Sequence, residues 1–468
     1  MEKEKNKKYS DRNTDIAAIC EKISEKVSKE KVDQWEIYGA AYSHNEIDLY
    51  KKEIENLSFA DTRGIGIRII KEGRTGYAYT SNLARDAINS CILKAIENSE
   101  ISDPDENNVL PLEKEDLFLD PEIDDDELFS RKILDFSTHD KVTMSRELEN
   151  AAFSSDKRVS GINNLIYEDS ISETAIINSN GFSKSFKSSS SFMYISVISR
   201  KGSDVSTGDY FDYKRDPSFF NISDIAFQAV KKSTSLLGAR KIKSLKTDLL
   251  MDPFVGAQFL NVISGIVSAD AVQKGKSLFK GKIGKKIFSI DVDVIDNGIM
   301  RGGMATQPFD AEGVPKGITT VFEKGVLKNF LYNSYTARKD GVKNTGNAVR
   351  SSYKSIPETG PSNFYMENGI KSFEDLLKKI DRGFYVIDIM GVHSGVNPVS
   401  GQISVGAKGI WIENGHFAFP VKEVTIASDI FSICKSLAET GNDLKFMPSG
   451  GYTGSPSLLF REIAVSGN

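Results

Sequence analysis

The chain has 468 residues, more than a single hydrophobic core usually holds, so we expect two or more domains. It is 39% apolar and 27% charged, which is ordinary for a globular protein, and no apolar run reaches the roughly 18 residues that would span a bilayer. A net charge of −5 argues against broad nucleic-acid binding, which needs a basic surface.

The N-terminal segment and the cysteines together predict a reducing compartment. The N-terminus is charged and lacks the apolar segment of a signal peptide, so we expect a cytoplasmic protein. The three cysteines, Cys20, Cys91 and Cys434, lie far apart in the sequence. Two of them fall on apolar faces of predicted helices, which favours buried, reduced thiols over a redox or metal role.

The first hundred residues predict an α+β unit. Apolar residues at helical spacing indicate an amphipathic helix between residues 13 and 31. Strand patterns follow at residues 33–42, 46–57, 64–71 and 74–80. Asn82 is then expected to cap a helix that runs to about Ser99.

An acidic stretch interrupts the pattern at residues 100–127, where Asp, Glu and Pro predominate. We interpret it as a solvated connector, with an acidic interaction segment as the alternative. A helix is predicted at residues 128–153, strands at 161–169, 173–178 and 182–201, and a helix at 222–237. The short run Ser188 to Ser191 is assigned to a strand face. The chain turns basic and polar after Arg240, so we place the domain boundary there, giving domains 1–240 and 241–468.

The second half predicts a buried helix followed by many short strands. Asp252 and Pro253 suit the cap and first turn of a helix at residues 252–267. Strands are expected at 318–323, 326–331 and 384–390, and helices at 372–380 and 428–439, the latter ended by Gly441. Asn414-Gly415 between two strand patterns is the strongest hairpin signal in the chain.

Several motifs resemble the TldD/PmbA family, also called modulators of DNA gyrase. The family's C-terminal signature resembles the glycine-rich segment 391–415 and its continuation 419–427. Further matching segments occur in the same order as in the family: Arg63 to Arg68, Gly73 to Tyr79, Pro308 to Pro315, residues 325–339 and Thr345 to Arg350. The resemblance implies a two-domain α+β fold with a strand-rich, barrel-like C-terminal domain.

In its active branch, the family resemblance implies a zinc peptidase with a helical His-Glu-x-x-x-His motif and a ligand cysteine near the C-terminus. The corresponding positions in this chain hold Leu260, Asn261 and Gly265, none of which can bind zinc. The C-terminal segment that should carry the cysteine has none, and no two of the four histidines stand at ligand spacing. We therefore expect no catalytic residues and no metal in this chain, as in the PmbA/TldE branch.

Other chemistries find little support in the sequence. His393, Ser394 and Asp388 contain the residue types of a hydrolase triad, but the segment is not a nucleophile elbow. We interpret these polar residues as part of a peptide-binding loop instead. The residues expected to face a peptide groove are Arg338, Asn347, Arg350, His393, Ser394 and Ser400. The alternative for the two arginines is a structural role, bracing carboxylates such as Asp310 or Glu312.

Two functional hypotheses remain open from the sequence. By resemblance, the chain is the non-catalytic subunit of a TldD/TldE-type zinc peptidase complex acting on unfolded or extended peptides, inactive alone, with zinc held by a His-Glu-x-x-x-His partner. Alternatively, it is a stand-alone homodimeric peptide-binding or scaffold protein. A metallopeptidase with unrecognised ligands is a weaker third possibility. No nucleic-acid or membrane partner is expected.

Overall fold

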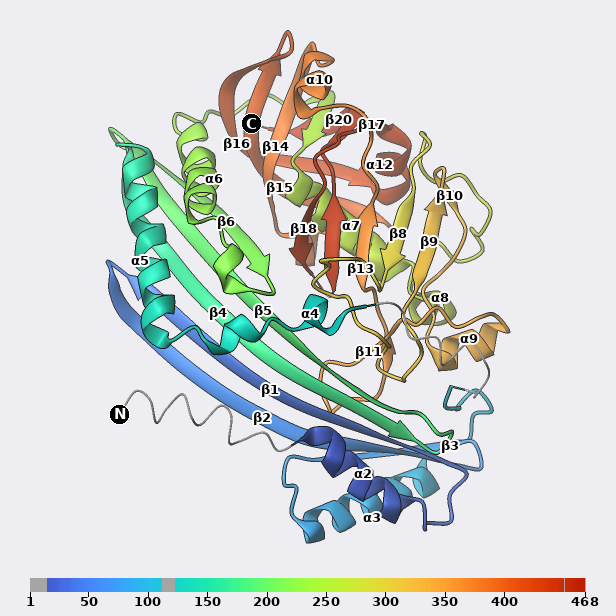
Figure 1. The fold of residues 1–468 in the computed structure, drawn as a ribbon. Coiled ribbons are helices and arrows are strands. Elements are labelled where there is room, and N and C mark those ends of the chain that lie inside the picture. Colours follow the sequence, from blue (N-terminus) through green and yellow to red (C-terminus); the bar gives the residue numbers. More distant parts are fainter. Residues whose placement is uncertain (1–14, 112–122, 450, 468) are drawn as a thin grey trace.

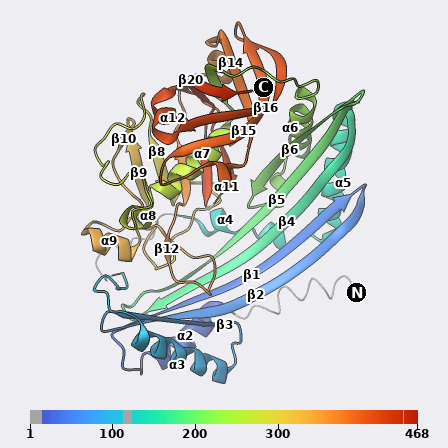
Figure 2. The ribbon, with the colours of Figure 1, turned by 180° about the vertical axis from the view of Figure 1, so that it is seen from behind.

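The computed structural model describes residues 15–111, 123–449 and 451–467. It has the predicted mixed α+β architecture: a long, curved sheet from the N-terminal half lies against a strand-rich C-terminal half (Figure 1). The opposite view shows the same two layers, with helices α2, α3 and α5 on the side of the long sheet that faces away from the C-terminal half (Figure 2). Among the described residues, no helix is both long and apolar enough to cross a membrane.

The N-terminal sheet has six antiparallel strands in the order β3-β2-β1-β4-β5-β6. Its strands are β1 (Gln34–Tyr50), β2 (Glu53–Lys71), β3 (Arg74–Thr80), β4 (Val159–Asn178), β5 (Ser183–Lys201) and β6 (Asp204–Lys214). The helices that pack on it are α2 (Ile16–Val27), α3 (Arg85–Ile101), α5 (Thr138–Ser155) and α6 (Ile222–Ser235). These helices bury one face of the N-terminal sheet. The other face of this sheet packs against the C-terminal half.

The first hairpin differs from its prediction. The sequence predicted breaks after residues 42 and 57, whereas β1 and β2 run on and turn at Lys51 and Lys52. Both lysines have positive φ, 52° and 65°, a conformation that usually calls for Gly or Asn. Helix α5 holds this turn, because Glu149 accepts a hydrogen bond from the Lys52 N–H at 2.9 Å and Arg146 donates to the Lys52 carbonyl at 2.9 Å. The turn therefore depends on a distant helix and carries no local signal.

Other boundaries also need correction. Asn82 does not cap α3, because its side chain accepts from the Ala84 N–H at 3.0 Å, before the helix begins. Helix α5 begins ten residues later than the predicted residue 128, at a capping box formed by Ser137 and Asp140. The short α4 (Asp125–Leu128) and a 3-10 turn (Arg131–Leu134) precede it. The two strands predicted within residues 161–178 are one strand, and β6 was not predicted.

The C-terminal half contains a closed barrel, as the predicted barrel-like character requires. Its sheet has the order β16-β15-β14-β7-β20-β17, and pairing of β16 with β20 closes it. These strands are β7 (Leu245–Met251), β14 (Arg382–Met390), β15 (Gln402–Glu413), β16 (His416–Asp429), β17 (Leu437–Thr440) and β20 (Leu458–Ser466). The hairpin predicted at Asn414-Gly415 is confirmed, with φ of 51° and 73° at the two turn residues.

A second sheet of the C-terminal half has the order β10-β9-β8-β13-β19-β18. Its strands are β8 (Val294–Asn297), β9 (Ile318–Glu323), β10 (Val326–Leu327), β13 (Asn363–Met366), β18 (Lys445–Pro448) and β19 (Tyr452–Ser455). A two-stranded pair, β11 (Ala348–Val349) and β12 (Glu358–Thr359), lies apart from it. Within the part of the chain that the structure describes, β6 and β18 are edge strands of their respective sheets, so each has one side without a neighbouring strand.

The helices of this half are α7 (Pro253–Ile266), α8 (Ala269–Gln273), α9 (Ser334–Asp340), α10 (Phe373–Lys378), α11 (Val392–Gly395) and α12 (Ile430–Ser436). Helix α12 is shorter than predicted: its chain passes directly into β17, so Leu437 reaches the core from a strand and Gly441 does not end the helix.

The three cysteines are buried free thiols, as predicted. Residues 112–122 of the predicted acidic connector, and residues 13 and 14 of the first predicted helix, lie outside the described residues.

Candidate functional site

Helix α7 lies at the position where the family resemblance implies a metal-binding helix. Its N-cap is Asp252, which accepts from the Phe254 N–H at 3.0 Å and from the Tyr385 hydroxyl at 2.8 Å. Gly256 allows the helix to approach β19 closely, since a Cβ there would lie 2.4 Å from Ser455 Oγ. The cap and this close contact fix the helix relative to the barrel and the second sheet.

The three positions on α7 that would carry the residues of the His-Glu-x-x-x-His motif hold side chains of another kind. Leu260 is fully buried in the core, Asn261 is half-buried, and Gly265 is exposed with nothing within 4 Å of a built Cβ. Hydrocarbon and neutral amide groups do not bind zinc in proteins. Cys434 lies in the same core, where burial raises the pKa of its thiol well above the usual range. The donor set of this helix therefore does not fit a zinc ion.

The rest of the described chain does not replace the missing ligands. Among residues 15–111, 123–449 and 451–467, no group of three or more His, Cys, Asp or Glu side chains could hold a metal ion.

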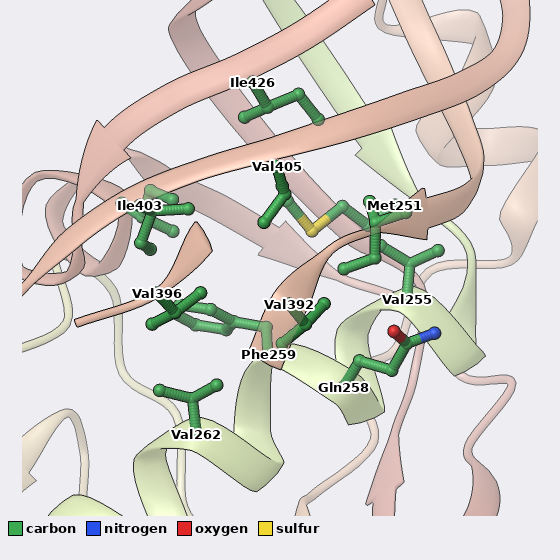
Figure 3. Close-up of a pocket in the computed structure, with 12 residues that line it drawn as sticks. Met251, Val255, Gln258, Phe259, Val262, Val392, Val396, Ile403, Val405 and Ile426 are labelled. Carbon is green, nitrogen blue, oxygen red and sulfur yellow. The ribbon is translucent and has the colours of Figure 1, made fainter. Parts of the chain in front are cut away.

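An apolar pocket opens beside α7 (Figure 3). Val255, Phe259 and Val262 line it from the helix, Val392 and Val396 from the α11 segment, and Val405 from β15. Figure 3 shows these side chains converging on a common space, with Gln258 at its margin. The volume of this space is about 30 Å³. Small apolar cavities stay dry unless an apolar group fills them, so the pocket suits a hydrocarbon group.

A second cavity of about 60 Å³, lined by both polar and apolar side chains, lies between the two halves of the molecule; we call it the interdomain crevice. Its walls are Thr207 to Asp209 of β6, Lys232 of α6, Gln258 of α7, Asp388 of β14 and Met447 of β18, among others. Gln258 lines both the apolar pocket and the interdomain crevice. The two cavities therefore adjoin along α7, where they form the candidate site.

The polar residues predicted to face a peptide groove are not gathered there. Ser394 and His393 belong to α11, and Ser400 follows it; all three are exposed in the segment whose Val392 and Val396 line the apolar pocket. Arg338 is exposed on α9, which Figure 2 places well away from α11. The role of these four residues stays a prediction.

Asn347 and Arg350 lie inside the protein instead of on a groove wall. The Asn347 amide donates to Asp296 Oδ2 at 2.7 Å and to the Gly360 carbonyl at 3.1 Å. The Arg350 side chain is fully buried and forms an ion pair with Glu36. This placement agrees with the bracing role left open for Arg350, although its carboxylate partner is Glu36 and not Asp310 or Glu312.

Arg350 is part of a buried ionic cluster, which we define as Glu36, Arg68, Glu312 and Arg350. Arg68 donates to Glu36 at 2.8 Å and to Glu312 at 3.0 Å. The second Glu312 oxygen accepts from the Ser334 N–H at the start of α9 at 2.9 Å. Since Glu36 and Arg68 belong to the N-terminal sheet and the other two to the C-terminal half, the cluster joins the halves.

Sequence reasoning missed the residues that build the candidate site. Gln258, Lys232 and Asp209 come from three separate elements, and none of them belongs to a motif. A partial signal existed for α7, whose residues 255, 258, 259 and 262 share one helical face. Strand β6 forms another wall of the interdomain crevice, and the sequence analysis did not predict this strand.

Comparison with known proteins finds the same family over most of the length of this chain. Models of the PmbA/TldA metallopeptidase family match domain 1 at residues 35–99, the central domain at 131–237 and the C-terminal domain at 244–467. Metalloprotease PmbA of Escherichia coli O157:H7 is 26% identical over 417 residues, covering 89% of this chain and 88% of that protein. A metalloprotease TldD homolog of Buchnera aphidicola is 25% identical over 480 residues, covering 95% and 94%.

Solved structures show the same fold. A crystal structure from Thermotoga maritima, of a candidate modulator of a DNA gyrase, has a TM-score of 0.87 at 27% identity and covers 96% of this chain and 99% of its own. TldE from Thermococcus kodakarensis has a TM-score of 0.83 at 24% identity, covering 96% and 100%.

Proposed function

Because the chain belongs to the TldD/PmbA family of metallopeptidases, we propose that it is a non-catalytic, TldE-like subunit of a zinc peptidase complex that acts on unfolded or extended peptides. The observation that carries the proposal is the set of side chains on α7 at the positions of the zinc motif. Leu260, Asn261 and Gly265 stand where the active branch, by resemblance, carries its two histidines and its glutamate. The zinc and the catalytic residues would come from a partner chain with a His-Glu-x-x-x-His helix.

Peptide binding is supported by the strand edges around the candidate site. β6 and β18 are edge strands, and residues of both line the interdomain crevice. The main-chain groups on a free strand edge can pair with an extended peptide and require little of its sequence. Such binding suits unfolded substrates, because folded proteins seldom present a free extended strand.

Association with a second chain is supported by the exposed part of β2. β3 pairs only with residues 65–71 of this strand, which leaves residues 53–64 beyond the end of β3. This segment exposes Ile54 by 43% and Leu57 by 55%. Long exposed strands with apolar side chains are uncommon in monomers, since they invite pairing with another chain. A catalytic partner and a second copy of this chain are both compatible with this surface.

A reconstitution assay tests the proposal. The purified chain, a His-Glu-x-x-x-His relative from the same cell, and the mixture are each given an internally quenched, unstructured peptide. We expect the mixture to cleave the peptide, a chelator to abolish cleavage, and this chain alone to be inactive. Cleavage by this chain alone that the chelator inhibits would overturn the assignment.

Pull-down from the native cytoplasm separates the proposal from the stand-alone alternative. Tagged chain should recover a relative that carries the zinc motif. Recovery of untagged copies of this chain alone, with no such relative, would favour the homodimeric peptide-binding or scaffold protein.

A further inference from the structure

We propose that one side of helix α7 binds the main chain of an extended peptide and places an aliphatic side chain of that peptide in the apolar pocket. This inference rests on the peptide-binding role proposed above. It specifies where the peptide lies and which side chain the site selects.

Helix α7 has a single row of residues that the rest of the fold leaves uncovered. Every residue of this helix is buried except Gln258, Asn261, Val262 and Gly265. Residues three, four and seven positions apart lie on one side of a helix, so these four form a continuous row, which we call the α7 stripe. Gln258 and Val262 also line the apolar pocket, and Gln258 lines the interdomain crevice as well. The α7 stripe therefore runs beside both cavities.

The two amides of the α7 stripe are available to a ligand. Gln258 and Asn261 are half-buried, and within the described ranges neither side-chain amide forms a hydrogen bond. A side-chain amide both donates and accepts, as does the main chain of a peptide. Residues three apart on a helix have Cβ atoms about 5–6 Å apart. Groups on one edge of an extended chain recur roughly every 7 Å, so two flexible amides can reach successive peptide groups.

Gly265 leaves room for a main chain at the end of the α7 stripe. This residue is exposed, and a Cβ there would meet nothing within 4 Å. Its φ is not positive, so the backbone of α7 does not require glycine at this position. Glycine destabilises a helix relative to alanine, whereas close approach of another backbone favours it. A peptide that lies against the helix accounts for both observations.

The apolar pocket determines which side chain the site selects. Of the residues that line it, Gln258 alone is polar. Val262, Val392 and Val405 are branched and stiff, so the walls keep their shape. A volume of about 30 Å³ admits the end of an aliphatic side chain but leaves little room for an aromatic ring. Because Val262 belongs to the α7 stripe, a peptide bound along the stripe passes beside this pocket.

Charge contributes little to this selection. The α7 stripe has no ionisable side chain. The interdomain crevice beside it is lined by two aspartates and two lysines, which balance each other: Asp209, Asp388, Lys232 and Lys408. We therefore expect an uncharged segment of the peptide to bind here, with an affinity that depends only weakly on salt concentration.

Peptide binding measured by fluorescence anisotropy tests the inference. Four labelled hexapeptides with both ends blocked are compared: one with a central leucine, one with serine in its place, one with tryptophan in its place, and the leucine peptide with N-methyl groups on the two main-chain amides that flank the leucine. We expect each of the last three to bind about tenfold more weakly than the leucine peptide. The N-methyl peptide reports on main-chain hydrogen bonds, and the other two report on the pocket.

Variants of the α7 stripe assign these effects to their residues. The double variant Gln258→Met/Asn261→Leu keeps the size of both side chains, and it should bind the leucine and N-methyl peptides equally weakly. Gly265→Leu should weaken binding of the leucine peptide although it raises thermal stability, a combination that a purely structural role would not produce.

Gln228→Leu is the matched control, because this amide lies on α6 outside both cavities and already donates to Asp224 at 3.1 Å. It should leave binding of all four peptides unchanged. Thermal unfolding of each variant checks that it is folded.

The outcomes distinguish this inference from the proposed function. Equal binding of all four peptides, or an unchanged affinity for the leucine peptide in the folded double variant, would overturn the inference and leave peptide binding elsewhere on the chain intact. Failure of the wild-type chain to bind any of the peptides would contradict both.

Discussion

At the scale of single residues, the buried ionic cluster is one of the contacts that join the two halves. The Arg350 guanidinium lies 4.6 Å from the centroid of the Tyr38 ring and forms an ion pair with Glu36. Its Nε also donates to the Ala311 carbonyl at 3.2 Å. Because each charge has a partner of opposite sign, the loss of one partner leaves an uncompensated charge in the interior.

Replacing Arg350 should therefore weaken the fold strongly. We expect Arg350→Gln to lower the free energy of unfolding by roughly 3–5 kcal/mol, because the Glu36 carboxylate would lose one of its two arginines. Arg338→Gln is the control, since Arg338 is exposed, and it should change stability by less than about 0.5 kcal/mol. Chemical denaturation of both variants measures the difference. Equal effects of the two substitutions would contradict the bracing role.

A second buried residue, Asp310, should make the free energy of unfolding depend on pH. Burial, and then the charge of Glu312, raise the pKa of the Asp310 carboxyl to about 7. An unfolded aspartate has a pKa of about 3.9, so between about pH 4 and pH 7 the folded protein keeps a proton that the unfolded chain has lost. This contribution favours folding at low pH, decreases as the pH rises through that window, and stays constant above it.

Asp310→Asn isolates this contribution because the amide does not titrate. Relative to the variant, the wild-type protein should lose unfolding free energy as the pH rises from about 5 to about 7. Denaturant titrations at several pH values measure the two curves. Parallel curves over this range would show that Asp310 has an ordinary pKa.

At the scale of elements, helix α7 contains two glycines, one in a tightly packed position and one in an open position. A Cβ at Gly256 would lie 2.4 Å from Ser455 Oγ and 2.9 Å from Ser455 Cβ, whereas a Cβ at Gly265 meets nothing within 4 Å. Gly256→Ala should cost roughly 1–3 kcal/mol through overpacking. Gly265→Ala should gain about 0.5–1 kcal/mol, since alanine favours the helix. Thermal unfolding of the pair tests the packing of α7 on β19, and equal shifts would refute it.

The β1–β2 turn gives another test at this scale. Lys52 has a φ of 65°, and its hydrogen bonds to α5 use only its backbone. Lys52→Gly should therefore keep these bonds and raise the free energy of unfolding by about 0.5–1 kcal/mol. In the β5–β6 turn, Gly202 has a φ of 63° with open space around it, so Gly202→Ala should have the opposite effect. A loss of stability in Lys52→Gly would contradict the assigned turn.

The elements that sequence could predict are those with local signals. Asn414-Gly415 defines its hairpin because both residues tolerate the turn conformation, and Asp252-Pro253 defines the start of α7 through a side-chain cap. Lys51-Lys52 carries no such signal, because contacts with α5 stabilise its turn. Leu437 has an apolar side chain that suits a helix or a strand equally, and only its pairing with β20 decides.

At the scale of the whole molecule, the candidate site depends on both halves of the fold. Lys232 belongs to a helix of the N-terminal half, whereas Gln258 and Met447 belong to the C-terminal half, so only the packing of the two brings them together. Sequence motifs identified α7 and the family, because those signals are continuous along the chain. They could not identify the interdomain crevice, whose walls are distant in sequence and carry no shared pattern.

We propose that this chain does not supply the metal site of the peptidase. Metal analysis of the purified protein, after incubation with excess zinc and removal of unbound ions, tests it most directly. Since Leu260, Asn261 and Gly265 offer no ligand group, we expect much less than one zinc ion per chain. One tightly held zinc ion per chain, retained without any partner, would contradict the account.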